Sequence, residues 1–174
     1  MRTEPRRKER AMMNPGEMEA LLVRRAIGQL ATTTEDGPYV VPVNYLFAEG
    51  CIYLHSGPKG RKIEALRTDP RVCFLVDEAG PQVTWERGCG ISQIYESVMC
   101  FGKAEFVEGL EERRRILDMM VHKFVPADAS PPLLNVNVGK TAVIKIRVEW
   151  MTGKANRISP IHTIISNQFL TGDR

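Results

Sequence analysis

Short runs of strand-forming residues, separated by turn-forming residues at close spacing, dominate the first third of the sequence. Three runs cover residues 29–34, 39–47 and 51–55, and the turns Glu35-Asp36-Gly37 and Ala48-Glu49-Gly50 separate them. Acidic residues followed by glycine are typical of the tight turn of a β-hairpin. The pattern predicts a three-stranded antiparallel meander, because parallel strands need much longer crossover connections.

Pro42 lies within the second of these runs. Proline has no N–H to donate, so it weakens a strand that pairs with neighbours on both sides. We therefore expect residue 42 at a bulge or at a sheet edge. Strand irregularities of this kind often lie next to ligands.

Three helices are expected around the strands. The first begins at the N-cap Asn14, with Pro15 at its first position and Glu17 placed for a capping box, and it extends to residue 26 or 27. The second is expected at residues 61–67. The third, at residues 110–124, has an amphipathic pattern and should pack against the sheet.

Further strands are expected later in the chain, at residues 71–77, 95–107 and 141–150. The last of them alternates in polarity and could close a barrel. Six strands with three helices indicate a mainly β protein with flanking helices and an antiparallel, barrel-like core. A doubly wound parallel sheet is not expected.

The composition fits one globular domain. A chain of 174 residues with 43% hydrophobic and 26% charged residues can bury a single core. No run reaches the roughly 18 to 20 apolar residues of a membrane helix, and the first residues lack the apolar segment of a signal peptide. We expect a cytoplasmic protein with no membrane partner.

The net charge of +3 has a local origin. Residues 1–10 hold five basic and two acidic side chains, which leaves 19 of each sign in the rest of the chain. A nucleic-acid partner is not expected, because such a partner requires a basic face on the folded domain. The basic residues form either a solvated arm or a segment that docks on a partner subunit or an anionic cofactor.

The cysteines and histidines are scattered along the chain. The four cysteines form no C-x-x-C pair and mostly lie in apolar runs; they are Cys51, Cys73, Cys89 and Cys100. Buried reduced thiols are expected rather than disulfides. A metal site is not expected, because zinc needs clustered soft ligands.

Residues 54–62, with the sequence LHSGPKGRK, place an imidazole, a hydroxyl, two glycines and three cations at a strand-to-helix junction. Helix N-termini present free amide donors, and Arg61 and Lys62 can neutralise a phosphate dianion. A solvated basic turn is an equal alternative at this point. Two familiar phosphate motifs are absent, since residues 138–141 lack the first glycine of a Walker loop and no G-x-G-x-x-G occurs.

Six blocks of the chain occur in a recognisable order. They are IGQLAT at 27–32, VPVNY at 41–45, IYLHS at 52–56, GRK at 60–62, TDPRVCF at 68–74 and YESVMCFGKA at 95–104. Together they resemble the pyridoxamine 5'-phosphate oxidase-like family of FMN-binding split barrels. Three further blocks, RRKER at 6–10, TAVIKI at 141–146 and TGKA at 152–155, are similar to its nitroimidazole-resistance branch.

The resemblance implies a six-stranded antiparallel split β-barrel that binds FMN non-covalently and forms a homodimer, with the flavin slot built between two subunits. It divides the chain into a basic arm at residues 1–13, the FMN-binding domain at 14–155 and a C-terminal tail at 156–174. It also implies an FMN-dependent oxidoreductase that reduces a small organic acceptor, for instance a nitroaromatic such as a 5-nitroimidazole. The alternatives are a non-catalytic flavin-binding sensor and a haem- or deazaflavin-binding relative.

The resemblance also implies a set of cofactor-binding residues. They are Pro42, Val43, Asn44, His55, Ser56, Lys59, Arg61, Lys62 and Ser97. Val43 and Asn44 would line the flavin ring, with backbone groups at its polar edge, although Val43 could instead be a core residue. His55 and Ser56 would approach the ring and the ribityl chain, and His55 is the one candidate for a catalytic role. Arg61 and Lys62 would hold the phosphate.

Three large aromatic residues could stack on a flavin or a flat substrate, or could fill the core or a dimer surface. They are Trp85, Tyr95 and Trp150. Glu96 stands where the oxidase itself favours glutamine. The substrate-phosphate residues of that oxidase and its arginine-rich ending have no counterpart in this sequence, so chemistry on pyridoxal phosphates is not expected.

Overall fold

The computed structural model describes residues 14–84, 91–126, 129, 132–157 and 163–164. The predicted basic arm, Trp85, Cys89 and most of the predicted tail lie outside this range. The described elements are α1 (Pro15–Arg24), β1 (Ile27–Thr34), β2 (Gly37–Ala48), β3 (Cys51–Ser56), α2 (Arg61–Thr68), β4 (Arg71–Thr84), β5 (Ser92–Phe106), α3 (Leu110–Phe124), α4 (Asn135–Lys140), β6 (Ala142–Asn156) and β7 (Thr163–Ile164).

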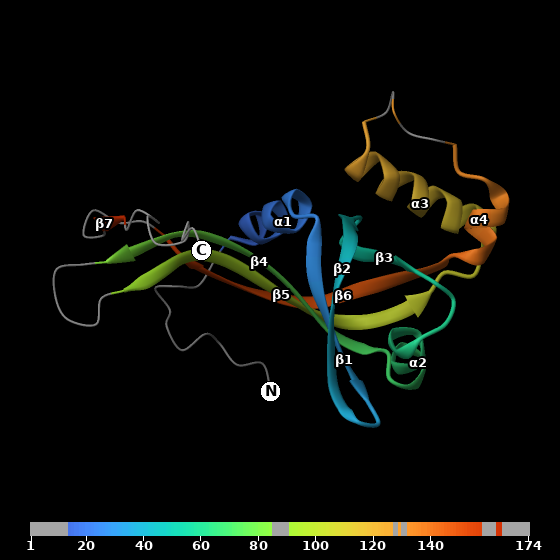
Figure 1. Ribbon diagram of the computed structural model, residues 1–174, viewed down its shortest axis with the longest axis horizontal. Coiled ribbons are helices and arrows are strands. Elements are labelled where there is room, and N and C mark those ends of the chain that lie inside the picture. The colour runs from blue at the N-terminus through green and yellow to red at the C-terminus, as the bar shows by residue number, and fades with distance from the viewer. Residues whose placement is uncertain (1–13, 85–90, 127–128, 130–131, 158–162, 165–174) are drawn as a thin grey trace, which may run out of the picture.

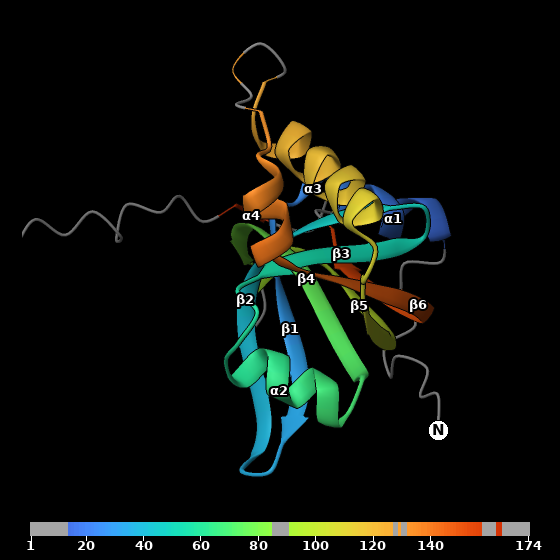
Figure 2. The ribbon, with the colours of Figure 1, turned by 90° about the vertical axis from the view of Figure 1, so that its right-hand side faces the viewer.

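Six strands form a closed ring. Their order is β1-β2-β3-β6-β5-β4, and a pairing between β1 and β4 closes it. All neighbouring strands are antiparallel. The short strand β7 adds to the far end of β4. The predicted fold class, a mainly β, six-stranded antiparallel split barrel with flanking helices, is confirmed (Figures 1 and 2).

The barrel interior and the underside of α1 form one core. Leu21 and Leu22 of α1 are fully buried there, together with Phe74 from the barrel. The Tyr45 ring meets Phe74 edge-on, with 5.0 Å between centroids, and its hydroxyl donates a 2.7 Å hydrogen bond to the Leu22 carbonyl. This buried hydrogen bond and the apolar contacts around it fix α1 over one end of the barrel.

A second core lies outside the barrel, under α3 and α4 (Figure 2). The outward-facing side chains Tyr53 of β3 and Val143 of β6 are fully or almost fully buried there. Ile116 and Met120 of α3 and Val138 of α4 cover them. The amphipathic pattern of α3 therefore packs on the sheet as predicted, with the predicted bounds.

The helix starts were predicted with mixed success. Asn14 is the N-cap of α1, and its side chain accepts a 2.8 Å hydrogen bond from the Gly16 amide, as predicted. The predicted capping box is wrong, because the Glu17 carboxylate accepts a 2.7 Å hydrogen bond from Arg157 instead. The helix ends at Arg24, earlier than predicted. Helix α4 was not predicted, since no side chain caps its first turn.

The strands β4 and β6 continue beyond their predicted ends, and β5 begins earlier than predicted, at Ser92. Strand β4 passes through Gly80 and Pro81 by means of a register shift between Ala79 and Gln82. A second shift occurs in β5 between Phe101 and Gly102. A side chain at Gly102 would overlap the Arg147 carbonyl, so only glycine fits where the two strands approach so closely.

Pro42 lies at a sheet edge, as predicted. The register of β2 against β1 is unbroken from residue 37 to residue 44. On its other side, β2 pairs with β3 only from Tyr45 to Ala48. The first eight residues of β2 therefore have one neighbour among the described strands, and this is the place where the barrel is split.

The described residues also bear on the membrane, metal-binding and disulfide-bonded classes that the sequence argues against. No helix in the described part of the chain is long and apolar enough to span a bilayer. The same residues hold no cluster of three or more histidine, cysteine or acidic side chains suited to a metal ion. Cys51, Cys73 and Cys100 are free thiols, and burial raises the pKa of the fully buried Cys100 to about 12.

Candidate functional site

The junction between β3 and α2 has an open helix N-terminus. Strand β3 ends at Ser56, and α2 begins at Arg61 after the cap residue Gly60. Gly60 has a φ of 117°, a conformation that glycine adopts without strain. No side chain caps the first turn of α2. Its first amide donors therefore remain available to an anion, which the helix dipole also favours.

Lys62 lies in this first turn and is half-buried. No carboxylate among the described residues pairs with its ammonium group. Burial lowers the pKa of Lys62 below its usual value. A partly desolvated cation without a counterion is unfavourable unless a ligand supplies the negative charge.

His55 lies close enough to Lys62 for the two charges to interact. Burial lowers the pKa of His55, and the Lys62 ammonium lowers it further. The imidazole is therefore neutral at neutral pH, with one ring nitrogen as a donor and the other as an acceptor. The His55 ring has no hydrogen bond with any described side chain or backbone group.

Arg61 points in a different direction from Lys62. Its guanidinium donates to Thr34 Oγ1 at 3.2 Å and to Asp36 at 3.3 Å, and it lies 5.0 Å from the centroid of the Tyr39 ring. The hollow beside it, about 310 Å³ in volume, is also lined by Glu35, Asp36 and Glu64. The predicted pair of cations is thus divided between an acidic hairpin and the open helix N-terminus.

Two further residues that were predicted to bind the cofactor lie in or next to the loop between β3 and α2. Ser56 is half-buried at the end of β3, and Lys59 is exposed one residue before the cap. Neither side chain has a hydrogen-bond or ion-pair partner among the described residues. Both are available to a ligand at the N-terminus of α2.

The free edge of β2 offers backbone groups. The Tyr45 amide donates to Ala26 on the β1 side at 3.4 Å. Backbone groups alternate between the two sides of a strand, so those of Asn44 and Pro42 face away from β1. The Asn44 amide N–H and the Pro42 carbonyl therefore point to the edge that lacks a neighbour. Both side chains are exposed, and Asn44 Nδ2 lies 3.4 Å from the Ala26 carbonyl.

Val43 has its side chain in the barrel core, with 9% of its surface exposed. The side chain is therefore a core residue, the alternative that the sequence left open, and the contact of residue 43 with a flavin ring stays a prediction. Alternation along the strand is the reason for its burial, because residues 42 and 44 point outward and residue 43 points inward.

Ser97 lies apart from the β3–α2 junction within one chain. It stands on β5 opposite Asp77 and Lys154, on the arm of the sheet that extends away from α2 (Figure 1). Its hydroxyl is 3.4 Å from the Lys154 carbonyl. The described residues of a single chain thus bring together Ser56, Lys62 and His55 but not Ser97.

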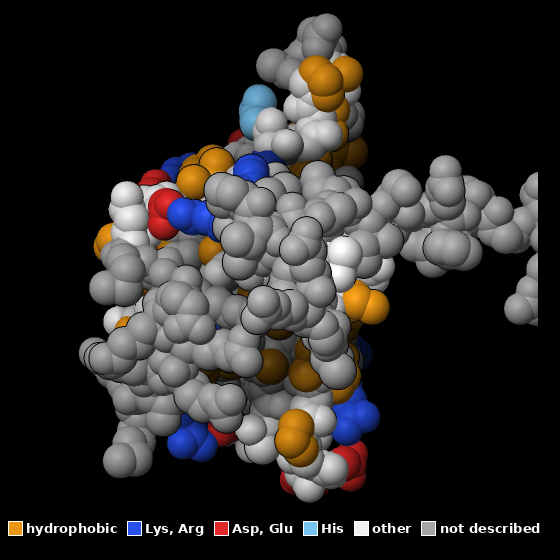
Figure 3. All heavy atoms as spheres, turned by 90° about the vertical axis from the view of Figure 1, so that its left-hand side faces the viewer, with side chains coloured by type: hydrophobic (Ala, Val, Ile, Leu, Met, Phe, Trp, Pro, Cys, Tyr) orange, Lys and Arg blue, Asp and Glu red, His pale blue; other side chains and the backbone are white. Residues whose placement is uncertain are grey.

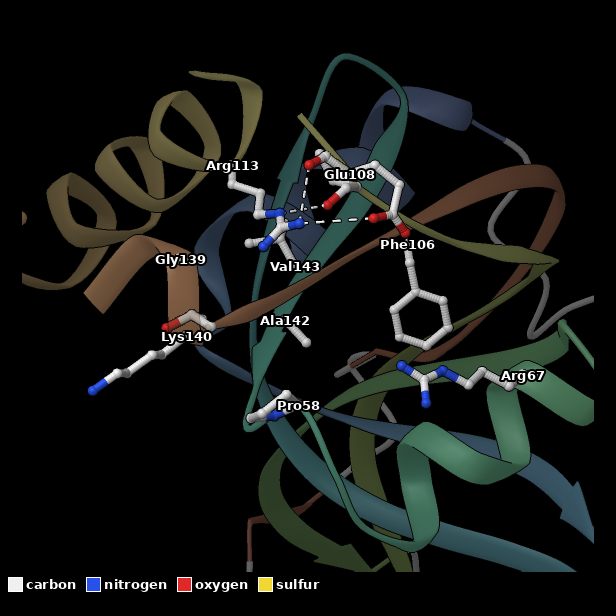
Figure 4. Close-up of a pocket in the computed structure, with 11 residues that line it drawn as sticks. Pro58, Arg67, Phe106, Glu108, Arg113, Gly139, Lys140, Ala142 and Val143 are labelled. Carbon is white, nitrogen blue, oxygen red and sulfur yellow. Dashed lines mark hydrogen bonds and ion pairs between the residues drawn. The ribbon is translucent and has the colours of Figure 1, made fainter. Parts of the chain in front are cut away.

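The hollow between α2, α4 and the end of β5, about 220 Å³ in volume, also contains cations (Figure 4). Arg113 is committed there, because it donates to the Val107 and Glu108 carbonyls and pairs with the Glu108 carboxylate. The Arg67 guanidinium lies 5.4 Å from the Phe106 ring centroid, and Lys140 points away from the hollow. This hollow therefore lacks the free converging charges that a phosphate needs.

Sequence reasoning missed an apolar outer face on the sheet. Directly paired residues point to the same side of a sheet, so two rows cross five strands. The first row is Val40, Ala31, Cys73, Phe101 and Trp150, and the second is Pro42, Gln29, Leu75, Met99 and Thr152. Phe101 and Trp150 stack with centroids 3.9 Å apart, so Trp150 has an aromatic neighbour within the chain.

Gln29 is the one polar interruption in the middle of this face. Its Oε1 atom is buried and has no hydrogen-bond partner among the described residues. Val40 on the same face is 59% exposed and Met99 is 37% exposed. Contiguous exposed apolar surface of this kind marks an interaction site. The sequence feature that could have indicated this face is Gln29, a glutamine among the apolar residues at the start of β1.

Glu96 belongs to a network of ion pairs under α1. Arg24 pairs with Glu96 at 2.5 Å and with Glu78 at 2.8 Å, and Arg157 pairs with Glu17 at 2.7 Å. Charges of both signs lie side by side on the coloured part of the surface in Figure 3, without a patch of one sign. Glu96 is thus held by arginines of its own chain.

Comparison with known proteins agrees with this architecture. The sequence model of the pyridoxamine 5'-phosphate oxidase family matches residues 14–155. A candidate 5-nitroimidazole antibiotic resistance protein from Bacteroides thetaiotaomicron has a TM-score of 0.74 and 32% identity, covering 83% of this chain and 85% of that one. The protein is a split-barrel protein in its fold, and it belongs to the pyridoxamine 5'-phosphate oxidase family.

Other relatives extend the range of bound cofactors. An FAD-binding protein from Mesorhizobium loti is 26% identical, with a TM-score of 0.62 over 85% of this chain and 97% of that one. The flavocytochrome Anf3 from Azotobacter vinelandii, 19% identical with a TM-score of 0.82, shares the fold over 98% of this chain and 86% of its own. A curated protein from Rhizobium meliloti is 28% identical over 75 residues, so the match spans about half of its length.

Proposed function

We propose that the protein binds FMN non-covalently at the junction of β3 and α2 and acts, as a homodimer, as an oxidoreductase on a small organic acceptor. The observation that carries this proposal is Lys62, a half-buried cation that lacks a carboxylate partner among the described residues and stands at an uncapped helix N-terminus. A phosphate dianion supplies the negative charge that this position lacks.

The residues around Lys62 fit the rest of the cofactor. Ser56 and Lys59 are free to contact the phosphate or the ribityl chain. The free edge of β2 supplies an N–H donor at Asn44 and a carbonyl acceptor at Pro42, which match the alternating acceptors and donor of a flavin pyrimidine edge. Arg61 contributes to the field of the site, but Asp36 already pairs with it.

When bound, FMN supplies the two-electron redox chemistry that protein side chains lack. Reduction of a nitro group to a nitroso group consumes two electrons and two protons and releases one water molecule. A reduced nicotinamide or a partner reductase must deliver those electrons. His55, neutral and without a side-chain hydrogen bond to other described residues, is placed to donate a hydrogen bond to a bound acceptor.

The acceptor class rests on the relative from Bacteroides thetaiotaomicron, which is described by its link to 5-nitroimidazole resistance. Identity of 32% over most of both chains supports a nitroaromatic acceptor for this protein too. The FAD-binding relative and the flavocytochrome make a larger flavin or a haem the outcomes to exclude. The predicted cytoplasmic location is part of the same proposal.

The homodimer is proposed from the outer face of the sheet. Its exposed valine and methionine, its unpartnered Gln29 Oε1 and the separation of Ser97 from Lys62 all fit a second copy packed there. Such a copy would bring its own Ser97 to the flavin. Val40→Lys should convert the dimer to monomers in sedimentation equilibrium, whereas Val23→Lys, at an equally exposed valine of α1, should remain dimeric. Equal dissociation of both variants would contradict this interface.

The visible spectrum of the purified protein tests the cofactor. We expect flavin bands, with a released compound whose mass is that of FMN. A Soret band would assign a haem protein, and release of FAD or a deazaflavin would assign another ligand. A colourless protein that does not change the spectrum of added FMN would refute the proposal. A flavin-binding protein without turnover of nitroaromatics in the presence of a reductant would be a sensor.

A further inference from the structure

A third cavity lies between α3 and α4, outside the barrel, where His55 forms part of its lining. It measures about 300 Å³ and is lined on α3 by Leu117, Met120, Val121 and Phe124. Leu133 and Val138 close it on the side of α4. No lysine, arginine, aspartate or glutamate occurs among the described residues that line it. An ion would lose its hydration there without gaining a partner, so the cavity suits an uncharged molecule.

The polar residues of the described lining lie at one end of this cavity, because Ser56, next to His55, pairs with Ala142, next to Thr141, and Thr141 bonds to Asn137. The Thr141 hydroxyl is occupied, because it donates to the Asn137 carbonyl at 2.8 Å. His55 and the Asn137 side chain also line this end. The His55 imidazole is neutral, because burial and the Lys62 charge lower its pKa. It can donate or accept one hydrogen bond toward the cavity.

The size of the cavity restricts its occupant. Ligand sites commonly measure roughly 300 to 1,000 Å³, so this one lies at the lower limit and admits one or two rings. It is too small for a complete flavin mononucleotide or for a helix of another protein. The apolar wall and the polar end match a flat ring with one polar substituent.

We propose that the α3–α4 cavity binds a small, uncharged aromatic compound whose polar substituent forms a hydrogen bond with His55. Binding of this compound does not depend on the proposed function, but its use as the electron acceptor rests on it. His55 would then stand between the two ligands, with Lys62 and the phosphate on one side and the aromatic ring on the other.

The test uses the full-length protein as purified and the neutral two-ring probe 6-propionyl-2-(dimethylamino)naphthalene, whose fluorescence rises and shifts to shorter wavelength in an apolar site. We expect saturable binding of about one probe per chain. Val121→Trp should fill the cavity and weaken binding at least tenfold. Val136→Trp, at an exposed valine of α4 outside the lining, should leave binding unchanged. No saturable binding, or equal binding to both variants, would overturn the proposal.

Competing ligands test the chemical class. Nitrobenzene should displace the probe, and benzoate, which is flat but anionic, should displace it at least tenfold less well. His55→Leu should weaken the competition by nitrobenzene about two- to tenfold and that by toluene not at all, as expected for one neutral hydrogen bond. Equal displacement by benzoate, or an equal effect of His55→Leu on toluene, would contradict the proposed role of His55.

Flavin binding is measured on the same samples by absorbance. Probe binding without flavin binding would refute the proposed function and leave the cavity assignment intact. Flavin binding without probe binding would refute the cavity assignment alone. The two proposals can therefore fail separately.

Discussion

Two basic corners of the barrel differ in what faces their cations. Under α1, Arg24 pairs with Glu78 and Glu96, and Arg157 pairs with Glu17. At the N-terminus of α2, Lys62 and Lys59 have no carboxylate partner among the described residues. The first corner has its charges balanced within the chain. The second keeps a positive charge that no carboxylate among the described residues balances, and for this reason we propose that α2 binds the ligand and that the charges of α1 are structural.

The adjacent residues Arg61 and Lys62 test this difference most strongly. Lys62→Met keeps the apolar stem and removes the charge, and we expect FMN to bind about ten- to a hundredfold more weakly, as for one or two lost charged hydrogen bonds. Arg61→Met should cost less than tenfold, because Asp36 already pairs with Arg61. Isothermal titration measures both, and Lys103→Met, an exposed site on β5, is the control.

A larger loss in Arg61→Met than in Lys62→Met would reverse the assignment. It would mean that the guanidinium leaves Asp36 on binding and takes the phosphate. Equal affinity of all three variants would place the phosphate elsewhere.

Lys123 of α3 belongs to neither of the two basic corners, and its titration extends the comparison between them. Its ammonium donates to the Arg25 and Tyr45 carbonyls at 2.6 and 3.0 Å, and burial lowers its pKa to about 8 from the ordinary 10.5. The unfolded chain therefore binds more protons between these values, and this group makes the folded state more stable as the pH rises through that range. Chemical denaturation between pH 7.5 and 10.5 should show this rise in the wild type relative to Lys123→Met. Parallel stability curves would contradict the shift.

The titration of His55 reports its charged neighbour directly. The pKa of His55 lies below the ordinary 6.5, so its contribution to stability decreases as the pH falls below that value. In Lys62→Met the repulsion is gone, and the pKa of His55 should rise while staying below its ordinary value, because burial is the larger cause. Proton NMR of the imidazole Hε1 signal measures this. An unchanged midpoint of the His55 titration would mean that the Lys62 charge does not act on His55.

The ion pairs under α1 should have the smallest effect. Arg24 and Glu78 are both more than a third exposed, and exposed pairs contribute about 1 kcal/mol or less to stability. Arg24→Gln should lower the free energy of unfolding by that amount in urea and should not change FMN affinity. A loss of FMN binding in this variant would mean that the α1 corner also takes part in the site.

Local patterns predicted most of the fold. The amphipathic spacing of residues 110–124 gave α3 its bounds, and Pro42 predicted the sheet edge, because both effects depend on neighbouring residues only. The extensions of β4 and β5 depend on the register shift at Ala79, and the extension of β6 on the shift at Phe101, and tertiary pairing creates both shifts. Helix α4 lacks a capping side chain and is held by packing of Val138.

The sequence predicted which segment of the chain forms the site, but not how the side chains of that segment are arranged in space. Adjacent positions in a helix point about 100° apart, so the pair Arg61 and Lys62 could not be assumed to act together. The inward direction of Val43 follows from alternation once Pro42 is known to face outward. The acidic hairpin that engages Arg61 and the outer face around Gln29 depend on contacts between distant parts of the chain, which residue spacing alone does not contain.

The preference for FMN over riboflavin tests the central claim most directly, because the two flavins differ only in the phosphate. The affinity ratio is measured for the wild type and for Lys62→Met by flavin fluorescence quenching. The wild type should prefer FMN about tenfold or more, and Lys62→Met should lose most of that preference through weaker FMN binding alone. A wild type that binds both flavins equally well, or a variant with an undiminished preference, would contradict a phosphate site at Lys62.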